Sequence, residues 1–239
     1  MPTCCLIIPC YNEAQRLPLE AFYSFLNNQH HFHCLFVDDG STDNTIEILN
    51  TAAARFPDKI SVHQLANNSG KAEAVRAGML HAGSTGKYDL IGFIDADLSA
   101  PLHVMCELLV ALEKEKNVTA AFGSRVKRLG ANVERKLVRH ILGRIFATFA
   151  TQILNITAYD SQCGAKLFRS STVSELFKKP FLSPWFFDLE IILRAGQNNI
   201  VEVPVSQWKE VGSSKIKFKD FIKAPFELLK IRRHYLSKK

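Results

Sequence analysis

Two carboxylates that follow an apolar segment are the residues in this sequence best placed to do chemistry. Asp95 and Asp97 come directly after LIGFI at positions 90–94 and are separated by Ala96. Such a pair can reach one hard divalent cation, Mg²⁺ or Mn²⁺, which bridges the oxygens of a diphosphate. The alternative is that the aspartates cap the helix that follows. We favour the cation, because other polar clusters follow neighbouring apolar segments.

A second pair of acids, Asp38 and Asp39, follows the apolar segment CLFV. A carboxylate at this point can accept hydrogen bonds from a nucleobase imide or a ribose hydroxyl. The alternative is an Asx turn in which Ser41 or Asp43 caps the next helix. Tyr11 follows the first apolar segment, and its ring is suited either to stacking on a base or to packing at the boundary of the core.

Lys71 follows Gly70 where the next helix is expected to begin. Free backbone N–H groups at a helix start and a lysine ammonium can together bind a phosphate. The alternative is a solvated basic helix start. The segment is not a P-loop, because the spacing of a Walker A motif is absent.

Apolar and amphipathic segments alternate through the first half of the chain, which is typical of strands and helices in turn. Strands are expected at 4–9, 34–38, 60–65, 90–94 and 120–123, and helices at 17–27, 45–56, 70–81 and 101–114. This alternation predicts an α/β fold with a Rossmann-like, mainly parallel central sheet flanked by helices. Ligands of such sheets gather beyond the carboxyl ends of the strands, where the polar clusters stand.

Composition sets broad limits on the protein. A chain of 239 residues with 47% hydrophobic and 22% charged residues can form one large domain. The 6 cysteines show no Cys-x-x-Cys spacing, so neither a zinc site nor a disulfide framework is indicated. The start of the chain does not resemble a signal peptide, and charges interrupt the longest apolar stretch, at 137–158. The net charge of +7 suits anionic partners in general.

Four motifs in register resemble glycosyltransferase family 2, the inverting enzymes of GT-A fold. They are PCYNE, VDDGSTDNT, NNSGKAEAVRAG and DADLSAP. The later segments DSQCGAKLF, WFFDLE and VSQWKEVGSSK are similar to the branch of dolichyl-phosphate β-glucosyltransferases and dolichol-phosphate mannosyltransferases. The resemblance therefore extends over almost the whole chain.

The resemblance assigns expected roles to individual residues. The nucleotide-sugar residues would be Pro9, Tyr11, Glu13, Asp38, Asp39, Lys71, Asp95, Ala96, Asp97 and Lys215. Asp95 and Asp97 would hold the metal, with Asp97 also counted as catalytic, and Ser99 stands where the mannosyltransferases have a glutamine ligand. Arg125 and Arg139 would grip the acceptor phosphate, for which a basic surface is the alternative. Asp160 would orient the sugar or act as a general base.

The expected reaction moves a hexose, glucose before mannose, from UDP-glucose or GDP-mannose to a polyprenyl phosphate of the dolichyl type. A phosphate monoester has a second pKa near ~6, so this acceptor is already an oxyanion and needs no protein base. The lipid acceptor implies peripheral association with the cytoplasmic face of a membrane. Ile145 to Ile156 and the basic amphipathic segment Ile216 to Lys239 suit an interface, and packing on the core is the alternative.

The expected domain organisation is a GT-A domain over residues 1–215, followed by a tail at 216–239. Within the domain, residues 1–125 would bind the nucleotide sugar and residues 126–215 the acceptor. One rival is a family 2 transferase that acts on a soluble or polysaccharide hydroxyl. Another is a nucleotide-binding or nucleic-acid-binding module without catalysis. We expect no nucleic-acid partner, because acids at three strand ends would repel a phosphate backbone.

Overall fold

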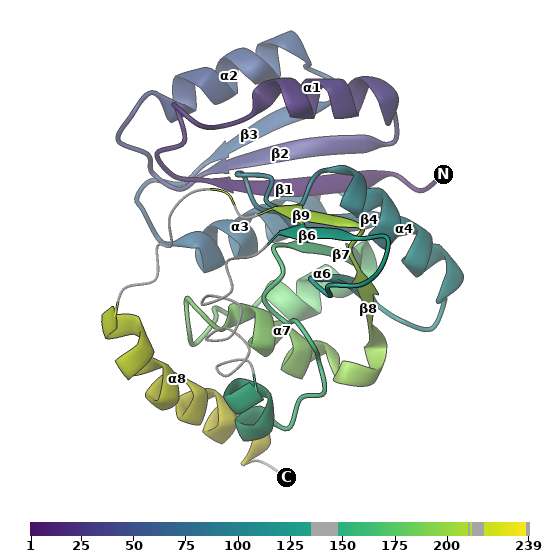
Figure 1. The fold of residues 1–239 in the computed structure, drawn as a ribbon. Coiled ribbons are helices and arrows are strands. Elements are labelled where there is room, and N and C mark those ends of the chain that lie inside the picture. Colours follow the sequence, from purple (N-terminus) through teal and green to yellow (C-terminus); the bar gives the residue numbers. More distant parts are fainter. Residues whose placement is uncertain (135–147, 210, 212–217, 238–239) are drawn as a thin grey trace.

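The computed structural model describes residues 1–134, 148–209, 211 and 218–237. Its central sheet has seven strands in the order β3-β2-β1-β4-β7-β5-β8 (Figure 1). The strands are β1 (Cys4–Cys10), β2 (Phe32–Asp38), β3 (Ile60–Gln64), β4 (Leu90–Ile94), β5 (Ala120–Ser124), β7 (Ala165–Arg169) and β8 (Ile200–Pro204). All neighbours pair in parallel except β7, which is antiparallel to both β4 and β5. The predicted α/β fold with a mainly parallel sheet is confirmed.

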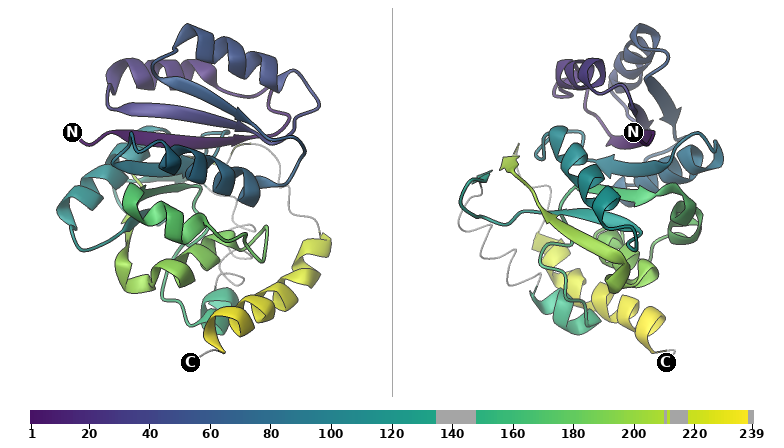
Figure 2. Two further views of the ribbon diagram at one scale, coloured as in Figure 1. Left: turned by 180° about the vertical axis from the view of Figure 1, so that it is seen from behind. Right: turned by 90° about the vertical axis from the view of Figure 1, so that its right-hand side faces the viewer.

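Helices cover both faces of the sheet (Figure 2). One face carries α1 (Leu19–Asn28), α2 (Thr45–Arg55) and α4 (His103–Lys114). The other carries α3 (Lys71–Ser84), α6 (Ser170–Phe177), α7 (Phe187–Ala195) and α8 (Phe218–Leu236). Strand β1 shows why two cores form: Leu6 and Ile8 join the first, while Cys5 and Ile7 join the second. Successive side chains of a strand point to opposite faces.

The chain changes direction across the sheet at β1. It runs outward from β1 through β2 to β3, and then returns to the other side of β1 with β4. In open α/β sheets, the crevice beyond the carboxyl ends of the strands at such a reversal is where ligands bind. The ends of β1 and β4 are therefore the place to look for a site.

A small second sheet lies next to this crevice. It pairs β6 (Asn132–Glu134) in parallel with β9 (Gln207–Lys209). The backbone N–H of Lys209 donates to the carbonyl oxygen of Ser99 at 2.8 Å, which ties β9 to the turn after β4. The short 3₁₀ helix η1 (Gln197–Asn199) leads into β8.

Helix α8 packs along the sheet's second face, next to the helical residues 148–154 (Figures 1 and 2). Its Ala224, Leu228 and Ile231 are buried in the second core. Arg232 donates from Nη1 to the carbonyl oxygen of Ile153 at 2.9 Å. Within the described ranges, no helix has both the length and the apolar character needed to cross a bilayer.

Candidate functional site

A pocket of about 490 Å³ opens beyond the carboxyl ends of β1 and β4. It is lined by most of the residues predicted to bind a nucleotide sugar: Pro9, Tyr11, Glu13, Asp39, Lys71, Asp95, Ala96 and Asp97. Asp38 is fully buried and does not line it. Lys215 and Arg139 lie outside the described residues. The fold thus brings together side chains from three strand ends and one helix start.

A tight turn presents the two aspartates that follow β4. The backbone N–H of Leu98 donates to the carbonyl oxygen of Asp95 at 3.1 Å, and that of Ser99 donates to Asp97 Oδ1 at 2.9 Å. Leu98 has φ of 50°, a left-handed conformation that is uncommon for a leucine. Backbone strain of this kind is concentrated at functional sites. The turn holds both carboxylates at the pocket wall.

Gly164 fits closely against the carboxylate of Asp95. Its carbonyl oxygen accepts the backbone N–H of Asp95 at 3.1 Å. A Cβ at position 164 would lie 2.2 Å from Asp95 Oδ2, so only glycine leaves that oxygen where it is. The segment DSQCG, which leads into β7, therefore supports Asp95 from the strand next to β4. Nothing in the local sequence around Gly164 indicated this contact.

Lys71 forms an ion pair with the first aspartate. Its Nζ lies 2.5 Å from Asp95 Oδ1, and the two side chains are 43% and 32% exposed. Burial lowers the pKa of Lys71, but Asp95, Asp188 and Asp97 outweigh it, and the pKa is raised. Lys71 is therefore a cation at the pocket, as predicted, and it lies directly beside a predicted metal ligand.

The two residues of the second acid pair, Asp38 and Asp39, make different contacts. Asp39 accepts hydrogen bonds from the backbone N–H groups of Ser69 and Gly70, both at 2.8 Å, and from Asn68 Nδ2 at 3.0 Å. Burial raises the pKa of Asp39. Asp38 Oδ1 accepts the backbone N–H of Ser41 at 3.3 Å in the turn after β2, but the N-cap position of the helix that follows is Asn44, and neither Ser41 nor Asp43. Asp39 thus positions the loop that precedes Lys71 while also lining the pocket.

Gly40 allows this arrangement. Its φ is +64°, and a Cβ there would lie 2.6 Å from the backbone carbon of Asn67. No other residue type permits both the left-handed conformation and the close approach of the two loops.

The residues after β1 form the opposite wall of the pocket. Tyr11 is 39% exposed, so its ring is accessible to a planar ligand. Glu13 is buried and pairs with Arg16, whose Nη2 lies 2.6 Å from Glu13 Oε1. Asn12 Oδ1 accepts the backbone N–H of Thr42 at 2.8 Å, which joins this loop to the one after β2. The nucleoside-binding roles of Tyr11 and Glu13 stay predictions.

Arg125 and Asp160 face each other in a bidentate ion pair. Arg125 Nε and Nη2 lie 2.6 and 2.7 Å from the two carboxylate oxygens, and the Arg125 backbone N–H donates to Oδ2 at 2.9 Å. The guanidinium also lies over the Trp208 ring, 5.4 Å from its centroid. Burial lowers the pKa of Arg125, but the hydrogen bonds to Asp160 raise it further. Arg125, which we predicted to bind the acceptor phosphate, and Asp160, which we predicted to be catalytic, are thus partners in one ion pair.

A buried ion pair lies behind the site. Lys166 Nζ is 2.7 Å from Asp188 Oδ1 and donates to the carbonyl oxygen of Cys163 at 2.7 Å. The ammonium also lies 5.2 Å from the Phe93 ring centroid and 4.9 Å from that of Phe122. Sequence reasoning missed this pair. Its only signal was a lysine inside the otherwise apolar strand AKLF.

The donor set fits a divalent metal only if a ligand completes it. Within the described part of the chain, no three or more His, Cys, Asp or Glu residues are grouped so as to hold an ion. The protein thus offers the carboxylates of Asp95 and Asp97, both at the pocket wall. Mg²⁺ is commonly bound through one or two carboxylates together with substrate phosphates. The residues fit a metal that arrives with, or is completed by, a diphosphate.

Several known proteins are similar to this chain over most of its length. The family model described as "Glycosyl transferase family 2" matches residues 5–177. A protein of Trichomonas vaginalis named dolichyl-phosphate beta-glucosyltransferase ALG5C is 32% identical, with 96% of this chain and 70% of that protein covered. The dolichyl-phosphate beta-glucosyltransferase of Saccharomyces cerevisiae is 33% identical, with 97% and 74% covered.

Solved structures share the fold at low sequence identity. Mannosyl-3-phosphoglycerate synthase from Rubrobacter xylanophilus aligns with a TM-score of 0.71 at 12% identity, over 99% of this chain and 75% of that one. Glucosyl-3-phosphoglycerate synthase from Mycobacterium tuberculosis, in complex with Mn²⁺, UDP-glucose and glycerol 3-phosphate, aligns with a TM-score of 0.68 at 16% identity. That alignment covers 99% of this chain and 80% of the synthase chain.

Proposed function

This chain belongs to glycosyltransferase family 2, and we propose that it transfers glucose from UDP-glucose to a polyprenyl phosphate of the dolichyl type. One observation carries the proposal: relatives named dolichyl-phosphate beta-glucosyltransferase are similar over 96% and 97% of this chain. The similarity therefore includes the segments after residue 125, beyond the nucleotide-binding motifs. Mannose from GDP-mannose is the second choice of donor.

The proposed acceptor simplifies the chemistry that the protein must perform. A phosphate monoester is an oxyanion at neutral pH, so its oxygen attacks the anomeric carbon without a general base. The bond from that carbon to the donor's diphosphate breaks, and the configuration inverts. The protein's main task is to hold two anionic reactants together in the correct geometry.

Arg125 and Asp160 suit this task as a unit. A carboxylate that binds one edge of a guanidinium through Nε and Nη2 fixes its orientation, so Asp160 positions Arg125 toward an anionic acceptor. The ion pair also makes Asp160 a poor general base, since its oxygens already accept three hydrogen bonds from Arg125. We assign Asp160 a positioning role.

Asp95 and Asp97 would hold a divalent cation, Mn²⁺ or Mg²⁺. When bound, such an ion neutralises charge that develops on the departing diphosphate. Lys71 adds a second positive charge at the same wall of the pocket. Tyr11 and Asp39 would contact the nucleoside, because both line the pocket on the side of β1 and β2.

The lipid acceptor requires the protein to work at a membrane, and we place it on the cytoplasmic face as a peripheral protein. Helix α8 supports a membrane contact: Phe226 and Leu229 are 72% and 50% exposed, and Lys223, Lys230 and Arg233 are exposed on the same helix. Apolar side chains together with basic ones favour an anionic lipid surface.

The cysteines fit the proposed cytoplasmic location. Among the six free cysteines, burial raises the pKa of Cys4 and Cys5 to about 12, as suits inert thiols of a reducing compartment.

A transfer assay tests the proposal. The protein is incubated with Mn²⁺, a polyprenyl phosphate and either radiolabelled UDP-glucose or GDP-mannose, and label is measured in the organic phase. We expect label from UDP-glucose, and we expect Asp97→Ala to reduce it by at least about a hundredfold through the lost metal ligand. The variant should unfold at the same urea concentration as the parent, because Asp97 is at the pocket wall.

The outcomes of this assay separate the rival functions. Label that appears only on an added sugar or polysaccharide hydroxyl would move the protein to the other class of family 2 acceptors. Equal label with Asp97→Ala would refute the metal site. Label from GDP-mannose alone would replace glucose by mannose.

A further inference from the structure

A lysine side chain, that of Lys71, lies beside the carboxylate of Asp95. Lys71 Nζ lies 2.5 Å from Oδ1, on the side of the pocket. The other oxygen, Oδ2, lies against the Cα of Gly164, where a Cβ would come within 2.2 Å. Oδ1 is fully covered, whereas the Asp95 side chain as a whole is 32% exposed, so Oδ2 is the oxygen that remains open to the pocket. A further cation at Asp95 must therefore share the carboxylate with Lys71 or displace it.

Two cations at one carboxylate repel each other, and the repulsion is twice as large for a divalent ion as for a unit charge. Lys71 and a divalent ion therefore compete for Asp95. We propose that Lys71 is a built-in competitor for the metal at Asp95, and that the diphosphate of the donor relieves the competition by giving the displaced ammonium a new partner.

The surroundings of Lys71 allow its ammonium group to move a short distance from Asp95 to another anionic partner. Its side chain is 43% exposed, so the four-carbon stem is not fixed by packing. Its backbone position is fixed, because Asp39 holds Ser69 and Gly70 immediately before it. The Phe187 ring centroid lies 6.0 Å from Nζ. The ammonium can leave Asp95 without leaving the pocket.

Asp188 limits how far the ammonium can move. It is one of the acids whose charge acts on Lys71, and its own carboxylate is held by the buried Lys166. Positive and negative side chains thus alternate in the order Lys166, Asp188, Lys71 and Asp95, each interacting with the next. A released ammonium keeps one anionic neighbour on the protein side and gains the diphosphate on the other.

The exchange makes the metal and the donor bind cooperatively. The metal alone must bind beside the ammonium of Lys71 or displace it, whereas the metal and diphosphate together supply the ammonium with a partner. By linkage, the factor by which a nucleotide tightens metal binding equals the factor by which metal tightens nucleotide binding. The inference rests on the proposed function, since it needs a diphosphate donor, but it concerns binding and not turnover.

Manganese binding without catalysis tests the inference. Free Mn²⁺ is measured by electron paramagnetic resonance in titrations of the whole protein, with and without UDP. We expect Lys71→Met to bind Mn²⁺ alone on the order of tenfold more tightly than the parent. The tightening of Mn²⁺ binding by UDP should fall by a similar factor. Lys71→Arg keeps the charge and should stay within about threefold of the parent in both measurements.

Arg16→Gln is the matched control. Arg16 also lines the pocket, but its ion-pair partner is Glu13, and the charge of Asp97 acts on it more weakly than that of Glu13. Removal of its charge should change the affinity for Mn²⁺ alone by less than about twofold. An equal increase in Arg16→Gln and Lys71→Met would mean that the field of the whole pocket, not the pair with Asp95, sets the affinity, and the inference would be wrong.

Two further results separate this inference from the proposed function. If UDP fails to tighten Mn²⁺ binding in the parent protein, the nucleotide-sugar site itself is refuted. If UDP tightens it, but Lys71→Met binds Mn²⁺ alone no better than the parent, competition is refuted and the transferase proposal stands.

Discussion

Asp95 shows how one residue depends on distant parts of the chain. Its backbone N–H is held by Gly164, its Oδ2 lies against the same glycine, and its Oδ1 contacts Lys71. These contacts come from α3 and from the start of β7, so neither is visible in the sequence around Asp95. The geometry of the carboxylate is therefore a property of the folded sheet.

Replacement of Gly164 tests this dependence at the scale of one methyl group. We expect Gly164→Ala to reduce glucosyl transfer and the affinity for Mn²⁺ with UDP by at least about tenfold, because the Asp95 carboxylate must move. Gly83→Ala is the control: Gly83 lies in helix α3, and a Cβ there would meet only side-chain atoms of Val173, at 3.3 Å, and Ile91, at 3.9 Å. Transfer assays and titrations measure both. Normal binding in Gly164→Ala would contradict the supporting role of this glycine.

The predicted site residues that line the pocket all belong to short motifs. The chemical role of such a motif can be inferred from its own residues and from the apolar segment before it. Asp95, Asp97 and Tyr11 follow apolar segments, and parallel strands bring such ends together. Gly164, Lys166 and the pairing of Arg125 with Asp160 depend on long-range packing. No local pattern of residues encodes those contacts, so the sequence alone did not predict them.

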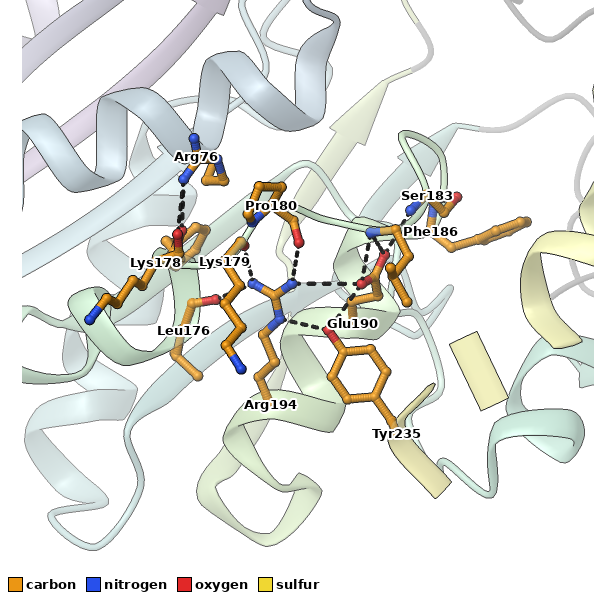
Figure 3. A network of polar contacts seen from close by, with 12 residues as sticks. Arg76, Leu176, Lys178, Lys179, Pro180, Ser183, Phe186, Glu190, Arg194 and Tyr235 are labelled. Atoms are coloured by element: carbon orange, nitrogen blue, oxygen red, sulfur yellow. Dashed lines mark hydrogen bonds and ion pairs between the residues drawn. The ribbon is translucent and has the colours of Figure 1, made fainter. Parts of the chain in front are cut away.

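At the scale of elements, a polar network joins α7, α8 and the loop between α6 and α7 (Figure 3). The fully buried Glu190 accepts the backbone N–H groups of Leu182 and Ser183, both at 2.9 Å, and the hydroxyl of Tyr235 at 3.1 Å. Arg194 donates to the carbonyl oxygens of Leu176, Lys179 and Pro180. The loop that precedes Phe187 and Asp188 is thus fixed to both helices.

The network predicts unequal costs for two substitutions. Glu190→Ala leaves Arg194 without its buried carboxylate and two backbone N–H groups without an acceptor, so we expect a loss of about 3–5 kcal/mol in unfolding free energy. Tyr235→Phe removes only the hydroxyl and should cost about 1 kcal/mol. Urea denaturation measures both. Equal losses would mean that Glu190 does not organise the network.

The sequence predicted the helices and strands of the first half of the chain, but not the full strand order of the sheet. The nine helices and strands expected before residue 125 are present, with ends that differ by a few residues. The antiparallel β7 was not predicted, because it arrives from the second half of the chain and inserts between β4 and β5. A local pattern identifies a strand, whereas its neighbours in the sheet depend on the path of the whole chain.

The whole molecule carries an apolar and basic surface on α8, away from the pocket-facing turns. The helix buries Ala224, Leu228 and Ile231, so packing on the core, the alternative considered from sequence, holds for that side. Phe226 and Leu229 remain exposed on another side of the helix. Packing on the core therefore leaves another face of the helix exposed, where the proposed membrane contact stays a prediction.

Flotation with anionic vesicles tests the membrane contact of the whole protein. We expect the double variant Phe226→Ser and Leu229→Ser to bind at least about tenfold more weakly, because each large apolar side chain contributes about 1.5–3 kcal/mol when buried. Val110→Ser is the control, since Val110 is 47% exposed on α4, which covers the other face of the sheet. Equal flotation of the parent and the double variant would assign the membrane contact to another surface.

The insertion of β7 also matters while the protein is being made. Among the described strands, β5 pairs only with β7 and β8, so neither partner is available to its backbone until the ribosome has passed Arg169, the end of β7. At ~5–20 residues per second, translation of that stretch takes seconds. During this interval the nascent chain presents β4 and β5 with open edges, which is when we expect it to need a chaperone most.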